Sequence, residues 1–194
     1  MVLANEQDQV LGNLVRAVHL LEEAPGIAWL MPEVRINLVY ALSTAECPRD
    51  VAGIEGRITA VKGRFRAAGY PAFGASDHMA RCLIEVRKYA PRWRAGMNFR
   101  WDPDLVKQVE NYCKNKSLTL GKIERSLEPR EIQEKDGSSM PWKIAQLAQG
   151  ARFPEIFYES PGWGKEPLFV ILGEDAVACV KKFLDLARAL SGSC

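Results

Sequence analysis

Short polar clusters framed by glycine contain the side chains of this sequence that are best suited to binding a phosphate. The clearest cluster is Gly74-Ala75-Ser76-Asp77-His78, which comes directly before an expected helix. Backbone N–H groups and the positive end of the helix dipole favour an anion at such a position, and glycine lets the anion approach closely. The alternative is an ordinary helix cap with a surface histidine. The cluster predicts a phosphate site formed by Gly74, Ala75 and Ser76, with His78 in the first helical turn.

Three other clusters offer cationic or amide side chains. Arg57 follows a glycine at the expected end of a strand, where its planar guanidinium suits a phosphate through two hydrogen bonds; a surface ion pair is the alternative. Lys165 also follows a glycine, and it is either a point charge for a phosphate or a solvated turn lysine. Asn98 and Arg100 lie together on another expected strand. These clusters indicate a small phosphorylated ligand.

The usual signatures of nucleotide sites, serine hydrolases and metal sites are missing from the sequence. Neither G-x-G-x-x-G nor G-x-x-x-x-G-K-[ST] occurs, and G-x-S-x-G and H-E-x-x-H are also absent. The chain has two histidines, and its five cysteines include no C-x-x-C pair. This predicts that no metal centre is built from protein ligands and that the thiols stay reduced.

The charge balance argues against a strongly electrostatic partner. The chain has 26 basic and 24 acidic residues and a formal charge of +2 at pH 7, so we expect neither a nucleic acid nor a membrane as partner. Aromatic and basic residues interleave over 88–100, which leaves a groove for single-stranded nucleic acid as an alternative that the near-neutral charge weakens. The N-terminus lacks the basic, apolar run of a signal peptide, and the apolar stretches are too short to span a bilayer. We therefore expect a cytoplasmic protein.

Helical and strand patterns alternate along the chain. With 194 residues, 47% of them hydrophobic, it can bury one substantial core. Apolar spacing indicates helices over 7–23, 77–89, 103–115, 141–149 and 175–190, and β-branched or aromatic runs indicate strands over 34–42, 51–58, 63–69, 96–101, 118–123, 156–158 and 168–172. The polar segment 128–139 is expected to be a loop beside the site. Because 51–69 is typical of a hairpin, the pattern predicts a single α/β domain over residues 1–194, with a mixed β-sheet flanked by helices.

Six short motifs occur in order along nearly the whole chain. They are Pro32-Glu33-Val34 with residues 37–42, residues 50–52 through Glu55-Gly56-Arg57-Ile58, residues 73–78 with Ala80-Arg81, Met97-Asn98-Phe99-Arg100, Gly137-Ser138-Ser139-Met140 and Gly164-Lys165-Glu166-Pro167. As an ordered set they resemble the archaeal-type thiamine-phosphate synthase domain, the ThiN family. Segment 141–150 matches the family pattern least well.

The resemblance implies a transferase that joins 4-amino-2-methyl-5-hydroxymethylpyrimidine diphosphate to 4-methyl-5-hydroxyethylthiazole phosphate, giving thiamine phosphate and pyrophosphate. It implies catalytic roles for Arg57 and His78. The implied substrate-binding and phosphate-binding set is Gly74, Ala75, Ser76, Asn98, Arg100 and Lys165. Because the thiazole nitrogen arrives unprotonated, no general base is needed. Mg²⁺ held mainly by substrate oxygens is the expected cofactor, without an organic one.

Members of the family are often fused to a hydroxymethylpyrimidine phosphate kinase, so such a kinase is the expected working partner, and a homodimer is compatible with the sequence. A second branch of the family carries a DNA-binding head and senses thiamine phosphates without making them. This chain has about thirty residues before its first motif, too few for a helix-turn-helix head together with the first helix. We therefore expect the enzyme, with a thiamine-phosphate-sensing domain of a regulator as the alternative.

Overall fold

A seven-stranded sheet forms the centre of the structure, a computed structural model that describes residues 5–129, 139–161 and 166–192. Its strands are β1 (Leu38–Ala41), β2 (Val51–Ile54), β5 (Pro71–Phe73), β6 (Ala95–Arg100), β7 (Leu120–Ile123), β8 (Ile156–Glu159) and β9 (Leu168–Gly173). They lie in the order β5-β2-β1-β6-β9-β8-β7, and every neighbouring pair is antiparallel except β7 and β8. A small second sheet pairs β3 (Ile58–Val61) with β4 (Arg64–Ala67).

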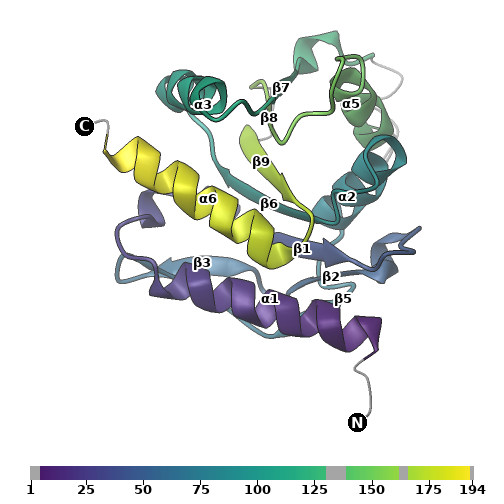
Figure 1. Ribbon diagram of the computed structural model, residues 1–194, viewed down its shortest axis with the longest axis vertical. Helices are drawn as coiled ribbons and strands as arrows, with labels where there is room; N and C mark the ends of the chain where they lie inside the picture. Colours follow the sequence, from purple (N-terminus) through teal and green to yellow (C-terminus); the bar gives the residue numbers. More distant parts are fainter. Residues whose placement is uncertain (1–4, 130–138, 162–165, 193–194) are drawn as a thin grey trace.

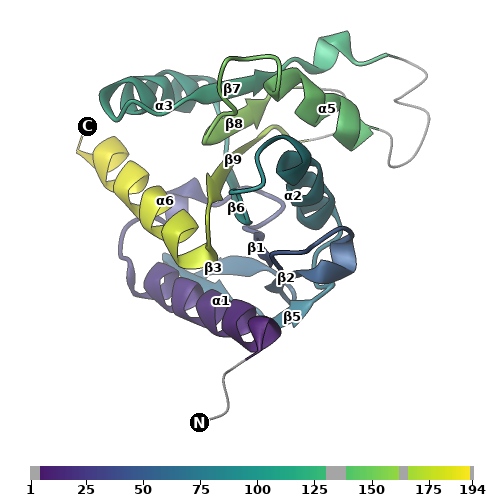
Figure 2. The ribbon, with the colours of Figure 1, turned by 45° about the vertical axis from the view of Figure 1, so that its right-hand side comes forward.

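Helices cover both faces of the main sheet. One face carries α1 (Glu6–Glu23), α3 (Pro103–Asn115) and α6 (Ala176–Ser191), and the other carries α2 (His78–Tyr89) and α5 (Ser139–Leu147). Figures 1 and 2 show α1 beside α6 and α2 beside α5. Three short 3-10 helices are η1 (Ala28–Leu30), η2 (Pro48–Asp50) and η3 (Arg125–Leu127). The predicted α/β class, with a mixed sheet flanked by helices, is confirmed.

The strands alternate between two hydrophobic clusters. In β1, Leu38 and Tyr40 belong to the cluster beneath α1, α3 and α6, whereas Val39 and Ala41 belong to the cluster beneath α2 and α5. Successive strand residues point to opposite faces, so a central strand covered on both sides is apolar at every position. This explains why β1 and β9 are nearly continuous apolar runs in the sequence.

The strand predicted over 51–58 is wrong in its boundaries. β2 ends at Ile54, and the chain turns before it enters β3. In this turn the Arg57 N–H donates to the Ile54 carbonyl at 3.0 Å, and Gly56 and Arg57 have positive φ angles of 66° and 70°. Glycine adopts that conformation at little steric cost, so Gly56 permits the turn. Arg57 therefore lies in a turn between two strands.

The start of α2 differs from the expected cap. Asp77 is the cap residue, but its carboxylate makes no capping hydrogen bond and accepts instead from Arg81 Nε at 2.9 Å. Helices α1, α3 and α6 do have side-chain caps, from Asn5, Asp102 and Asp175. The first-turn N–H groups of α2 therefore do not donate to the Asp77 side chain.

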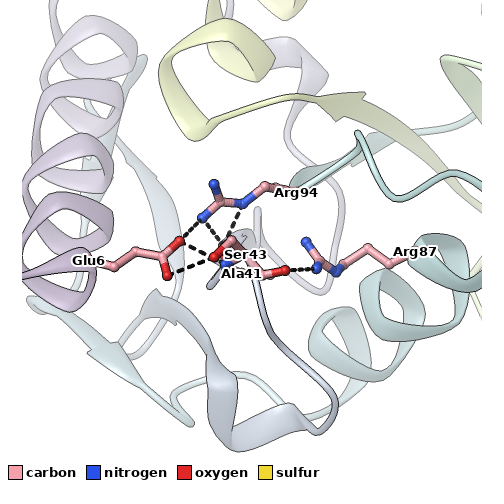
Figure 3. A network of polar contacts seen from close by, with 5 residues as sticks. All are labelled: Glu6, Ala41, Ser43, Arg87 and Arg94. Atoms are coloured by element: carbon pink, nitrogen blue, oxygen red, sulfur yellow. Dashed lines mark hydrogen bonds and ion pairs between the residues drawn. The ribbon is translucent and has the colours of Figure 1, made fainter.

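A polar network fixes the start of α1 against β1 and α2 (Figure 3). The Glu6 carboxylate accepts from the Ser43 N–H at 2.7 Å and from the Ser43 hydroxyl at 2.9 Å. Arg94 Nη2 donates to Glu6 at 2.6 Å and to the Ala41 carbonyl at 2.9 Å, while Arg87 donates to the Ser43 carbonyl at 2.6 Å. Burial raises the pKa of Glu6, but the hydrogen bonds from Ser43 and the charge of Arg94 outweigh burial and hold that pKa below its usual value.

Replacing Glu6 with glutamine tests this network. Because the folded pKa is lowered, the carboxylate stabilises the fold above its unfolded pKa, near 4.5, and loses this contribution as pH falls through the folded pKa. Since the pair is partly exposed, we expect Glu6→Gln to lower the free energy of unfolding at pH 7 by about 1 kcal/mol or less. Urea denaturation at several pH values should show the difference shrinking below about pH 4.

The matched control is Glu23→Gln, which removes the exposed partner of His19 on the same helix. We expect this control to change stability less than Glu6→Gln at pH 7. Equal losses in the two variants, or a Glu6→Gln deficit that persists at low pH, would contradict the stabilising role of the network.

Candidate functional site

A cavity of about 320 Å³ lies between α2, α5 and the sheet. This volume is at the lower end of the range for small-molecule sites, which are mostly apolar with a few polar groups that orient the ligand. Its apolar lining is Val34, Met79, Cys82, Ile123, Met140, Ile144, Phe157, Leu168 and Val170. Its polar lining is Asn37, Arg57, His78, Asn98, Arg125, Lys143, Glu159 and Glu166.

Strand alternation places the polar groups of β6 and β8 in the cavity. In β6, Met97 and Phe99 belong to the cluster beneath α1, α3 and α6, so Asn98 between them faces α2 and α5. In β8, Ile156 belongs to that same cluster, and Glu159, three residues further along the strand, lines the cavity on the other face. The period of two therefore decides which strand residues can reach a ligand.

Arg57 and His78 line the same cavity although they come from different elements. Arg57 is exposed, in the turn after β2, and its Nη1 donates to the Val34 carbonyl, which orients the guanidinium. His78 is exposed and is the first residue of α2. Both side chains that the family resemblance singles out are thus brought to one place. Their catalytic roles stay predictions.

A chain of buried hydrogen bonds lies against the cavity. Asn37 Nδ2 donates to the Ser76 hydroxyl at 2.7 Å, the Asn37 N–H donates to Asn98 Oδ1 at 2.6 Å, and Asn98 Nδ2 donates to the Arg35 carbonyl at 3.1 Å. Asn37 and Asn98 line the cavity, whereas Ser76, only 6% exposed, is not part of the lining. Ser76 and Asn98 therefore hold the segment before β1 in place. Asn37 was not singled out from the sequence; its signal is an amide between two buried apolar residues.

Gly74, Ala75 and Arg100, three other predicted binding residues, are described by the structure and do not line the cavity. The N–H of Gly74 donates to the Val51 carbonyl at 3.0 Å, and neither Gly74 nor Ala75 is part of the lining. Arg100 donates to the Trp29 carbonyl at 3.3 Å and also pairs with a carboxylate of its own segment. Lys165, like most of the expected loop 128–139, lies outside the described residues.

Two buried cations at the β8 side of the cavity were not predicted from the sequence. Lys143 Nζ lies 2.7 Å from Glu159 Oε2, and Arg125 Nη1 lies 3.7 Å from the same oxygen. Lys143 is 2% exposed and Arg125 9%. The available signal was Lys143 itself, because it interrupts the apolar stripe of Met140, Ile144 and Leu147 on α5.

Hydrogen bonds around Glu124 position the backbone of Arg125. The Arg125 N–H donates to the Ser160 hydroxyl at 2.9 Å, and that hydroxyl donates to Glu124 at 2.8 Å. Hydrogen bonds from Lys122, Ser160 and Ser126 lower the pKa of Glu124 to about 2. Glu124 therefore stays anionic at physiological pH and accepts these bonds permanently. Elsewhere in the wall, burial and then the charge of Glu159 raise the pKa of Cys82 to about 12, so its thiol is neutral.

Comparison with known proteins identifies the family. The family model described as "Thiamine-phosphate synthase ThiN" matches residues 13–185. The chain belongs to this family. It is 33% identical over 177 residues to the thiamine-phosphate synthase ThiN of Methanothermobacter thermautotrophicus, covering 91% of each chain. It is also 35% identical over 179 residues to the bifunctional thiamine biosynthesis protein ThiDN of Methanocaldococcus jannaschii, of which the match spans 40%.

A solved structure shares the fold of this chain. The chain is 30% identical to a structure described as the C-terminal domain of phosphomethylpyrimidine kinase, with a TM-score of 0.89, covering 93% of this chain and all of that one. Over the described residues, no helix is long and apolar enough to cross a membrane. The same residues contain no group of three or more histidine, cysteine, aspartate or glutamate side chains arranged to hold a metal ion.

Ser76→Ala tests whether the hydrogen-bond chain is structural. The substitution leaves the buried Asn37 amide without its acceptor, so we expect the free energy of unfolding to fall by about 1–3 kcal/mol. Urea denaturation measures the loss. Ser191→Ala, at the exposed end of α6, is the control and should change stability much less. If the two variants were equally stable, Ser76 would not have the structural role assigned to it.

Proposed function

We propose that this protein is a thiamine-phosphate synthase, formed by residues 1–194 as a single domain, that acts on the pyrimidine diphosphate and thiazole phosphate named above. The single observation that supports the proposal is that Arg57 and His78 line one cavity with apolar walls, in a member of the ThiN family. The bifunctional relative, and a solved relative described as part of a phosphomethylpyrimidine kinase, support a working link to such a kinase.

The proposed reaction is a displacement at the methylene carbon of the pyrimidine. The lone pair of the thiazole nitrogen forms the new carbon–nitrogen bond, and the carbon–oxygen bond to the diphosphate breaks, with its electrons leaving on pyrophosphate. No proton is removed from the nucleophile, so a general base is not needed. The electron-rich aminopyrimidine stabilises positive charge at the methylene carbon while negative charge grows on the leaving group. The protein must align the two rings and stabilise that negative charge.

Arg57 and His78 are suited to stabilising the negative charge on the leaving group. The guanidinium is always charged, and one Nη of Arg57 already donates to the Val34 carbonyl, which leaves other N–H groups of its fork for an anion. His78 stands in the first turn of α2, whose dipole favours an anion at the same end. A bound diphosphate favours the imidazolium form of His78, which can donate a hydrogen bond to a leaving oxygen.

The apolar walls are suited to aligning the two rings. Met79, Ile144, Phe157 and Val170 line the cavity and offer surfaces against which two aromatic rings can pack. Such walls also keep water from the electron-deficient methylene carbon, where hydrolysis would compete with transfer.

Magnesium enters the proposal as part of the substrate. The two carboxylates among the described lining residues are already engaged, since Glu166 accepts from the N–H groups of Glu33 and Val34 at 2.8 and 3.0 Å and Glu159 pairs with Lys143 and Arg125. These side chains therefore do not form a protein-held magnesium site. We propose that Mg²⁺ is held mainly by diphosphate oxygens, as is usual for this ion.

The activity itself is tested by incubating the protein with both phosphorylated precursors and Mg²⁺ and measuring thiamine phosphate and pyrophosphate. We expect both products in equal amounts. Absence of product beside an active control enzyme would refute the proposal. Tight binding of thiamine phosphate without turnover would favour the sensing domain instead, and salt-dependent oligonucleotide binding would favour a nucleic-acid-binding module.

Arg57→Ala and His78→Ala test the two catalytic roles. Because each group would act on charge that develops in the transition state, we expect kcat to fall on the order of a hundredfold or more, with little change in the KM for the thiazole phosphate. Steady-state kinetics beside thermal melts measure this. Arg64→Ala, at an exposed position of β4, and His19→Ala, on α1, are the matched controls and should keep wild-type turnover. Near-wild-type kcat in both site variants would place the chemistry elsewhere.

A further inference from the structure

Among the cavity-lining residues that the structure describes, cationic side chains outnumber carboxylates. Of these residues, Arg57, Arg125 and Lys143 are cationic and Glu159 and Glu166 are anionic. Glu166 is bound to two backbone N–H groups, so Glu159 is the one described lining carboxylate that pairs with the two buried cations. Within this described set, two buried cations share one carboxylate on the β8 side of the cavity.

Burial makes this excess costly without an anion. Lys143 and Arg125 are both at least nine-tenths buried, and both are part of the cavity lining. Arg125 is held by Glu159 only at 3.7 Å, and its Nε has no hydrogen-bond partner among the described residues. A buried charge or donor without a partner costs free energy, which a bound anion would offset. The two cations share one carboxylate and can accept a further anion.

Lys143 and Arg125 lie on the same face of the sheet as Arg57 but several strands away from it. The Arg57 guanidinium contacts Val34, just before β1, whereas Glu159, which holds Lys143 and Arg125, is on β8. The strands β1, β6, β9 and β8 are consecutive neighbours in the sheet. Three interstrand spacings of roughly 5 Å each separate the two positions. One cavity thus has two cationic ends with apolar walls between them.

The proposed substrates also have two anionic ends. The diphosphate leaves from the pyrimidine methylene, and the thiazole carries its phosphate on the hydroxyethyl arm, beyond the bond that forms. We propose that Lys143 and Arg125 bind this phosphate monoester, while Arg57 and His78 face the leaving diphosphate. The assignment rests on the proposed function. A lysine point charge beside an arginine fork suits a phosphate group, and its place opposite the leaving group aligns the thiazole nitrogen with the methylene carbon.

The test compares the binding of thiamine phosphate with that of unphosphorylated thiamine by titration calorimetry. The two probes differ only in the phosphate, so the ratio of their dissociation constants isolates this subsite. We expect the wild type to prefer thiamine phosphate by at least about tenfold. Lys143→Met should lower the preference by about tenfold, and Lys143→Arg should largely restore it. Lys107→Met, an exposed lysine on α3, is the control and should leave the ratio unchanged.

Glu159→Gln separates binding from a purely structural role. Removing this carboxylate leaves both cations for the phosphate, so we expect the preference for thiamine phosphate to be kept or to rise, even if the melting temperature falls. A wild-type ratio near one, an unchanged ratio in Lys143→Met, or a lost preference in Glu159→Gln would each overturn the subsite. Because binding needs no turnover, an active enzyme with an unchanged Lys143→Met ratio refutes the subsite alone. An inactive protein with the expected ratios refutes the proposed reaction alone.

Discussion

The central sheet is covered on both faces, and this constraint decides where polar chemistry can exist in the molecule. Its strands alternate between two apolar clusters, so a polar strand residue is tolerated only where a cavity or a hydrogen-bond partner receives it. Asn98 and Glu159 satisfy this condition on the face beneath α2 and α5. The opposite face, beneath α1, α3 and α6, contains the larger apolar cluster. The cavity thus interrupts the apolar cluster beneath α2 and α5.

The cavity combines exposed and buried cations, which suits two different demands. In the proposed reaction, the exposed groups Arg57 and His78 meet a highly charged diphosphate that arrives from water and leaves again as pyrophosphate. Buried groups such as Lys143 and Arg125 act at a lower effective dielectric, where a single charge discriminates more strongly between ligands. The apolar lining between the two ends suits the uncharged parts of the rings. Charge is therefore distributed along the cavity in the same order as along the proposed pair of substrates.

The local parts of this structure could be predicted from sequence, and the tertiary parts could not. The five α-helices of the described residues follow from apolar spacing, because an amphipathic stripe depends only on residues within one element. The boundary of β2 was missed because the Glu55-Gly56-Arg57 turn depends on the positive φ of Gly56 and Arg57, and Gly56 was interpreted as part of a strand. Arg57 and His78 were singled out by motif, and the fold brings them to one cavity. Arg125, Lys143 and Glu159 were missed because their pairing joins η3, α5 and β8, which are distant in sequence.

The most direct measurement is a crystal structure of the protein with thiamine phosphate, pyrophosphate and Mg²⁺ bound together. We expect both molecules in the cavity between α2 and α5, with pyrophosphate contacting Arg57 and His78 and the phosphate of thiamine phosphate within hydrogen-bond distance of Lys143 and Arg125. The thiamine rings should then lie against the apolar walls, in line with the pyrophosphate. Either molecule bound outside this cavity, or the two anions exchanged between its ends, would contradict the proposed placement of the two substrates.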